Sequence, residues 1–207
     1  MAINVQQLGL QPYQTTWQAM QEFTQLRQED TPDELWIVEH PATFTQGLNG
    51  QDEHLLHQNH EIPIIKTDRG GQITFHAPGQ LIIYILFDLK RAKLGVRALV
   101  TLIEQSIIDY LQQFNIAATA RSDAPGVYVD QQKIASLGLK IRKQKSYHGL
   151  ALNVDMDLTP FQYINPCGLK TMKMTQLANL LPKPPTLLQT GNGLTQILIK
   201  RLTSSHL

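Results

Sequence analysis

The order of apolar and polar residues along the chain predicts strands and helices that interleave without a regular repeat. Short runs rich in Ile, Leu and Val predict strands, and apolar residues recurring every three or four positions predict helices. We expect strands over residues 4–10, 35–38, 62–66, 81–87, 126–129, 133–141 and 149–154, and helices over residues 17–26, 96–114, 171–181 and 187–202. This order favours an α+β fold around a mixed, largely antiparallel sheet flanked by helices.

Two of the expected helices carry a clear apolar stripe, which we interpret as core packing because such spacing places the residues on one helix face. Thr15 or Thr16 is expected to cap the first helix, and Asn115 suits the end of the second. The stripes are Trp17, Met20, Phe23 and Leu26 in the first helix, and Leu99, Ile103, Ile107, Tyr110, Leu111 and Phe114 in the second. Between the first helix and residue 62, residues 39–47 are expected to form a polar turn.

A second, glycine-rich polar turn over residues 68–80 leads into the most apolar strand, residues 81–87. It places Arg69, Thr74 and His76 at the mouth of a strand that should be buried on both faces. Gly70 and Gly71 would let the backbone approach a ligand closely. Polar groups at the edge of such a strand are typical of a binding site. A tight turn would give the same pattern, so the residues alone leave both readings open.

Composition and charge restrict the class of protein. The chain has 207 residues, a net charge of +1 and 17% charged residues, which fits a single domain over residues 1–207. No global field attracts nucleic acid or a membrane surface, and the apolar run 81–87 is too short to cross a bilayer. The N-terminus lacks the basic and apolar regions of a signal peptide. We therefore expect a cytoplasmic protein without nucleic-acid or membrane partners.

Two charged segments each allow a functional and a structural interpretation. His54, His57 and His60 recur every third residue, but no cysteine accompanies them, and a solvated surface is favoured over a metal site. Residues 140–145 are rich in Lys and Arg. They form either a solvated hairpin tip, which is favoured, or a docking patch for an acidic partner.

The chain has one cysteine, Cys167, which forms no disulfide within the chain and agrees with a reducing compartment. Pro166 and Gly168 can present its thiol at a turn. A free thiol has a pKa near 8.5, so a nearby cation is needed to make it a thiolate at neutral pH. The candidate cations are Lys170, Lys173 and the distant Lys133, and the candidate bases are His76 and His148.

Several segments together resemble the signature of the lipoyl(octanoyl) transferases, also called lipoate–protein ligase B. The matching segments are residues 69–84, 125–129, 133–138, 148–154 and 165–169, with Glu39-His40-Pro41, Thr45 and Gly47 in addition. The resemblance covers about residues 10–180. It implies one catalytic domain similar to that of the biotin and lipoate ligases.

The resemblance also implies an activity and a set of site residues. The family moves an octanoyl group from acyl carrier protein to a lysine of lipoyl domains, in 2-oxoacid dehydrogenases and in the H protein of glycine cleavage. The family's catalytic cysteine and lysine correspond to Cys167 and Lys133. Its substrate contacts correspond to Arg69, Gly70, Gly71, Gln72, Ile73, Thr74, Phe75, His76, Ser136, Leu137, Gly138, Gly149, Leu150 and Ala151.

The cysteine and lysine that the resemblance implies permit a two-step acyl transfer through a thioester on Cys167. The acyl group arrives on the carrier's phosphopantetheine arm, so no separate cofactor, ATP or metal is expected. Lys133 would first stabilise the thiolate and then accept a proton from the incoming amine, while His76 would orient the site or fix its own loop. One rival is an ATP-dependent lipoate/octanoate–protein ligase of the same fold. The other is a non-enzymatic acyl-binding or redox module.

Overall fold

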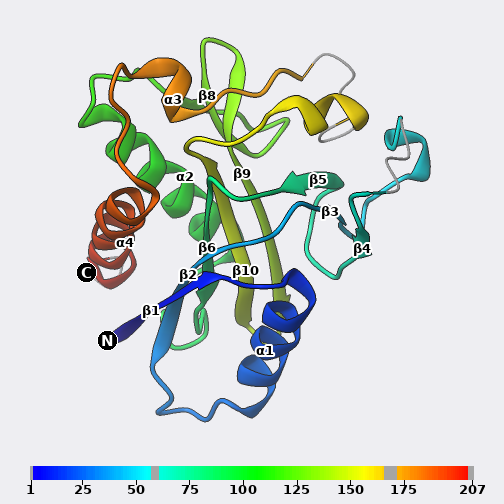
Figure 1. The fold of residues 1–207 in the computed structure, drawn as a ribbon. Helices are drawn as coiled ribbons and strands as arrows, with labels where there is room; N and C mark the ends of the chain where they lie inside the picture. Colours follow the sequence, from blue (N-terminus) through cyan, green and yellow to red (C-terminus); the bar gives the residue numbers. More distant parts are fainter. Residues whose placement is uncertain (1, 57–60, 166–171, 205–207) are drawn as a thin grey trace.

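A large mixed sheet and a small sheet form the framework of the protein. The computed structural model describes residues 2–56, 61–165 and 172–204. Within these residues the large sheet has the strand order β1-β2-β6-β10-β9-β8-β7 and the small sheet the order β4-β3-β5 (Figure 1). The strands are β1 (Ile3–Leu10), β2 (Asp33–Glu39), β3 (Thr43–Gln46), β4 (Ile64–Lys66), β5 (Ile73–His76), β6 (Gln80–Leu86), β7 (Thr119–Ala120), β8 (Gly126–Val129), β9 (Gln132–Arg142) and β10 (Lys145–Asn153).

Most strand pairs are antiparallel. Only the pairs β1–β2 and β3–β4 are parallel among the paired strands of the described residues. The expected α+β class with a mixed, largely antiparallel sheet is therefore confirmed. The sheet also explains why no strand–helix alternation was visible, because antiparallel neighbours can be joined by short hairpins. The β9–β10 hairpin is the clearest case.

Helices cover both faces of the large sheet. Figure 1 shows α2 (Val96–Gln112) and α4 (Leu187–Ser204) on one face and α1 (Tyr13–Leu26) with the small sheet on the other. The remaining helical elements are short: α3 (Leu177–Leu180) and the 3-10 turns η1 (Asp52–His54) and η2 (Thr159–Tyr163). None of the described helices is long and apolar enough to cross a membrane.

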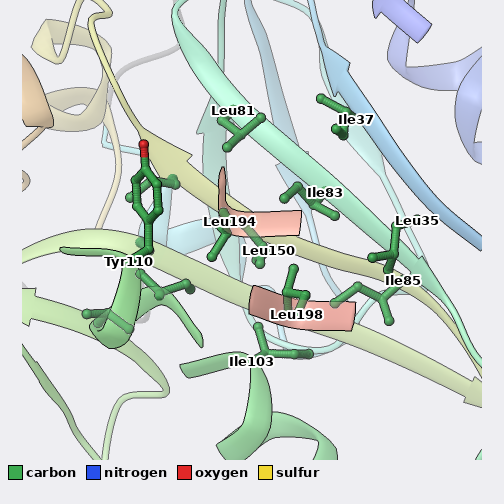
Figure 2. Close-up of a cluster of buried hydrophobic side chains, with 14 of the residues drawn as sticks. Leu35, Ile37, Leu81, Ile83, Ile85, Ile103, Tyr110, Leu150, Leu194 and Leu198 are labelled. Atoms are coloured by element: carbon green, nitrogen blue, oxygen red, sulfur yellow. The ribbon is translucent and has the colours of Figure 1, made fainter. Parts of the chain in front are cut away.

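The strand β6 is buried along its whole length and supplies side chains to both faces. Its odd-numbered residues Leu81, Ile83 and Ile85 pack in the cluster with α2 and α4, whereas Ile82 and Tyr84 pack toward α1. This follows from the two-residue period of a strand. Figure 2 shows the first cluster, in which β2 and β6 side chains meet Leu194 and Leu198 of α4.

Several expected elements are corrected by the structure. The helix α1 begins at Tyr13 after Pro12, and no side chain caps it, so the expected cap at Thr15 or Thr16 is wrong. Proline suits this place because its fixed φ costs a helix start little. Leu26, expected in the core, is 62% exposed. Part of the expected turn at residues 39–47 is the buried strand β3, and β10 begins four residues earlier than expected.

The expected helix over residues 171–181 is also wrong in extent. Of the described part, only Leu177–Leu180 is helical. The preceding residues pair with β9 instead: the Lys133 amide donates to the Lys173 carbonyl (2.8 Å) and the Thr175 amide to the Lys133 carbonyl (2.9 Å). Backbone groups used in this way cannot form a helix.

Candidate active site

A cavity lies between the large sheet and the glycine-rich turn, on the face that α1 covers. It encloses about 590 Å³, its open mouth included. The lining residues come from α1, the turn and β5, and the strands β6, β9 and β10. They are Tyr13, Arg69, Gly71, Gln72, Ile73, Thr74, His76, Ile82, Tyr84, Lys133, Ser136, Leu137, Gly138, His148, Gly149, Leu150 and Ala151.

The cavity gathers most of the residues that the sequence singled out. Arg69, Gly71, Gln72, Ile73, Thr74, His76, Ser136, Leu137, Gly138, Gly149, Leu150, Ala151 and Lys133 all line it. Gly70 and Phe75 do not. The Gly70 amide donates to the Leu139 carbonyl of β9, and Phe75 packs against Phe44 and Phe161 in the core beneath the small sheet. Their expected contact with a ligand therefore has no support in the geometry.

Sequence reasoning missed three lining residues, Tyr13, Ile82 and Tyr84. The alternation along β6 gave a usable signal for Ile82 and Tyr84, because it places them on one face of the sheet. No local pattern signalled Tyr13, whose ring stacks on His76 with centroids 5.7 Å apart. Burial raises the pKa of Tyr13 to about 12, so its hydroxyl stays protonated at neutral pH.

Arg69 shapes the glycine-rich turn. Its guanidinium donates to the Thr45 hydroxyl (2.9 Å), the Gly70 carbonyl (2.9 Å) and the Gln72 carbonyl (2.8 Å). Arginine can do this because its planar group offers five donors in a fixed arrangement. The side chain thus ties the turn to β3 and holds the backbone of the turn against the cavity.

Lys133 is a buried lysine at the start of β9. It is 1% exposed, and its Nζ donates to the Pro125 carbonyl at 2.9 Å and lies 5.5 Å from the centroid of the Tyr128 ring. Gly126 makes room for it: a Cβ there would lie 2.5 Å from Lys133 Cε. Lysine is rarely buried to this extent unless it is paired or functional.

Cys167 lies outside the described residues, as does Lys170. The described chain resumes at Met172, and residues 173–175 pair directly with Lys133. Residues 173–175 follow Cys167 by six to eight positions. They are hydrogen-bonded to β9, the strand that carries Lys133. Among the candidate cations, Lys133 lines the cavity, whereas the described Lys173 is exposed and does not.

Three buried histidines lie in or beside the cavity: His76 and His148 line it, and His40 contacts the lining residue Tyr84. His40 Nδ1 donates to the Gln11 carbonyl and its Nε2 accepts from the Tyr84 hydroxyl, both at 2.6 Å. Burial lowers the pKa of His40 to about 4 and that of His76 to about 3, so both rings are neutral at pH 7. Neutral rings of this kind position their partners without adding charge to an apolar site.

His148 differs because a carboxylate holds it. Its Nε2 donates to Asp68 Oδ1 at 2.9 Å, and its Nδ1 has no hydrogen-bond partner in the described part of the chain. Burial alone would raise the pKa of Asp68, but hydrogen bonds from His148 and Tyr147 hold it well below its usual range. Burial lowers the pKa of His148 despite the carboxylate. His148 also has a φ of +57°, which is rare for a side chain other than glycine.

The two charged segments lie outside the lining of this cavity, although Lys140 is close enough to His148 to lower its pKa. The basic residues 140–145 form the tip of the β9–β10 hairpin, at the opposite end of β9 from Lys133 and about 30 Å from it along the strand. Both interpretations of this segment stay predictions, because Lys140 lies two residues beyond Gly138, which lines the cavity. His54 is buried in η1, against the expectation of a solvated surface, and His57 and His60 lie outside the described residues. Among the described residues, no three His, Cys, Asp or Glu side chains form a group that could hold a metal ion.

Comparison with solved structures supports the fold. Lipoate-protein ligase A bound with ATP superposes with a TM-score of 0.74 at 13% identity, covering 99% of this chain and 85% of the ligase. Biotin protein ligase from Aquifex aeolicus in complex with biotin and ATP gives 0.64 at 13% identity, covering 97% and 71%. At such low identity the likeness concerns the fold alone, and it agrees with the expected similarity to the biotin and lipoate ligases.

Comparison of sequences identifies the family. The octanoyltransferase of Hydrogenovibrio crunogenus is 65% identical over 191 residues, covering 90% of each chain, and that of Shewanella oneidensis is 55% identical over 205 residues, covering 99% of this chain and 94% of its own. The family model for the lipoyl protein ligase A/B catalytic domain matches residues 12–198. The chain therefore belongs to the octanoyltransferase family, within the lipoyl protein ligases of the A/B catalytic type.

Proposed function

We propose that this octanoyltransferase moves an octanoyl group from the phosphopantetheine arm of acyl carrier protein to a lysine of a lipoyl domain, through a thioester on Cys167. One observation carries the proposal. A largely apolar cavity is lined by a buried lysine, in a chain 65% identical to an octanoyltransferase. The lipoyl domains of 2-oxoacid dehydrogenases and the H protein of glycine cleavage are the proposed acceptors, in the cytoplasm.

The first step exchanges one thioester for another. The Cys167 thiolate attacks the octanoyl carbonyl, and the phosphopantetheine sulfur leaves as a thiolate that takes the proton of the Lys133 ammonium, which leaves Lys133 neutral for the second step. Lys133, as an ammonium, stabilises the Cys167 thiolate before attack. Because bonds of the same type form and break, this step requires little net free energy and no ATP.

The second step forms an amide. The neutral amine of the acceptor lysine attacks the acyl-enzyme carbonyl, and Cys167 leaves as a thiolate. A base removes the proton that the amine loses, and Lys133 in its neutral form has this role. Amide formation from a thioester is favourable, so it draws the sequence forward.

The walls of the cavity suit a medium-length acyl chain. Ile82 and Ala151 turn apolar side chains to this face of the sheet, and Ile73 lines the cavity from β5, whereas the side chains of Leu137 and Leu150 pack in the cluster with α2 and α4. Burying about seven CH₂ or CH₃ groups at ~0.8 kcal/mol each contributes about 5–6 kcal/mol to binding. One methylene more or less changes the discrimination between two acyl substrates by a factor of roughly ten or somewhat more. We therefore expect a preference for octanoyl over neighbouring chain lengths without their complete exclusion.

The intact mass of the protein after brief incubation with octanoyl carrier protein tests this proposal. Without ATP, we expect the mass of one octanoyl group to be added, to be removed by hydroxylamine, and to pass to a lipoyl domain on chase. The Cys167→Ser variant should gain no thioester. Transfer without any adduct would refute the thioester, and transfer only with added ATP would indicate the ligase reaction instead.

A further inference from the structure

We propose that a buried hydrogen-bond relay positions Lys133 for the transfer, and that His76 is part of this relay instead of an acid or base. The role of Lys133 in this statement rests on the proposed function. The relay begins at the glycine-rich turn, crosses from the small sheet to the large one, and ends on the segment paired with Lys133. Its members, in order, are Arg69, Thr45, His76, Gln80, Asn153 and the carbonyl of Thr175.

Backbone carbonyls fix the direction of the relay at one end. Asn153 faces the Thr175 carbonyl at 2.9 Å, and a carbonyl only accepts, so the Asn153 amide nitrogen points there and its oxygen points to Gln80. Gln80 must then donate to that oxygen (2.9 Å), as it also does to the Phe75 carbonyl (3.2 Å). Neither amide can be turned without placing two acceptors or two donors together.

This direction determines the tautomer of His76. The Gln80 oxygen lies 2.7 Å from His76 Nδ1 and can only accept, so Nδ1 carries the hydrogen. The neutral ring then has a bare Nε2, which lies 3.2 Å from the Thr45 hydroxyl and accepts from it. Both ring nitrogens of His76 are therefore engaged within the protein.

Arg69 fixes the other end. The guanidinium has no acceptor, and its Nε (3.2 Å) and Nη2 (2.9 Å) both donate to the Thr45 hydroxyl oxygen. The hydroxyl hydrogen is thereby left to donate to His76. Each group accepts from the one before it and donates to the one after it, which is the arrangement in which neighbouring hydrogen bonds strengthen one another.

The end point of the relay links it to the reaction. Thr175 belongs to the segment that pairs with Lys133 on β9, through bonds of 2.8 and 2.9 Å. The Asn153 donor adds a bond from β10 to this segment, next to the two bonds with β9, while Gln176 and Ala178 bond to residues 154–156 further along. All five side chains are buried, so water cannot replace a lost partner, and a broken link leaves an unsatisfied group.

The first test is the tautomer of His76, measured by ¹⁵N NMR of the histidine rings in the intact protein. We expect a protonated Nδ1 and an unprotonated Nε2 that keep their states between pH 6 and pH 8. A protonated Nε2, or titration of the ring in this range, would overturn the relay. This readout is independent of catalysis.

The second test breaks the last link with the near-isosteric Asn153→Asp variant, in which a carboxylate oxygen replaces the donor to Thr175. We expect hydrogen exchange of the Thr175 and Lys133 amides to accelerate about tenfold or more, which corresponds to the loss of one net hydrogen bond, and single-turnover octanoyl transfer to slow about tenfold. Ser106→Ala is the matched control, because it removes an equally buried donor to a carbonyl (2.7 Å) within α2. It should change neither quantity.

The outcomes separate the relay from the proposed function. Unchanged exchange in Asn153→Asp would refute the relay. Faster exchange with a wild-type transfer rate would refute its positioning role, provided that Lys133→Met abolishes transfer. If the Lys133→Met variant transfers octanoyl at the wild-type rate, the proposed role of Lys133 is refuted, and so is the proposal that the relay positions a catalytic lysine. The hydrogen-exchange data then still decide whether the relay holds residues 173–175 in place.

Discussion

The replacement of Gly126 by alanine tests whether the place of Lys133 matters for transfer. Gly126 lies at the start of β8 with a φ of +143°, and its amide donates to Glu104 Oε1 at 2.9 Å. A Cβ at this position would lie 2.5 Å from Lys133 Cε and 2.6 Å from the Ala135 carbonyl oxygen. The lysine side chain can move away from the added Cβ, but the carbonyl belongs to the backbone of β9, so β8 must shift as well.

The size of the effect follows from these distances. An ordinary contact needs at least 3.4 Å, so Lys133 Cε must shift by about 0.9 Å. Misplacing a catalytic group by about 1 Å can cost roughly a hundredfold in rate. Alanine at this φ also adds backbone strain, of about 1–3 kcal/mol. We therefore expect transfer to fall by about two orders of magnitude in a protein that is folded but less stable.

Single-turnover transfer and urea unfolding of Gly126→Ala would be compared with two control variants. Gly9→Ala carries strain without a clash, because Gly9 has a φ of +66° and no atom within 4 Å of the added Cβ. Gly193→Ala carries a clash away from the site, with the Tyr110 ring at 2.8 Å. Both should lose stability and keep their transfer rate. A Gly126→Ala rate within threefold of wild type would refute the reasoning.

Two further predictions concern stability. The hydrogen-bond partners of Asp68 lower the pKa of its carboxyl group in the folded protein. The carboxylate therefore stabilises the fold above about pH 4, where Asp68 is ionised in the unfolded chain as well. This stabilisation is lost as the pH falls below that value. Asp68→Asn should therefore cost about 2 kcal/mol of unfolding free energy at pH 7 and less at pH 3, by urea unfolding; an equal loss at both pH values would contradict this. Leu198→Ala should cost about 2–5 kcal/mol, since Leu198 is fully buried against α2, yet leave single-turnover transfer unchanged because α4 lies across the sheet from the cavity.

Sequence patterns located the elements whose own residues decide their structure. The apolar stripe of α2 and the unbroken apolar run of β6 require burial wherever the chain places them, so periodicity alone sufficed. Residues 43–46 and 172–176 were misassigned because their backbone partners are distant in sequence. Thr45 pairs with Thr74 of β5, and residues 173–175 pair with Lys133. Such pairing leaves little local signal.

The sequence by itself determined the α+β class and the family resemblance, and the resemblance predicts Cys167 and Lys133 as the catalytic pair. Only the tertiary structure decided which side chains share the cavity, and it added Tyr13 and Tyr84 while removing Gly70 and Phe75. It also decided that His76 is occupied on both ring nitrogens. The physical reason is that motifs follow residue order, whereas the direction of a hydrogen bond and the state of a buried ring depend on groups brought together from β3, β5, β6 and β10.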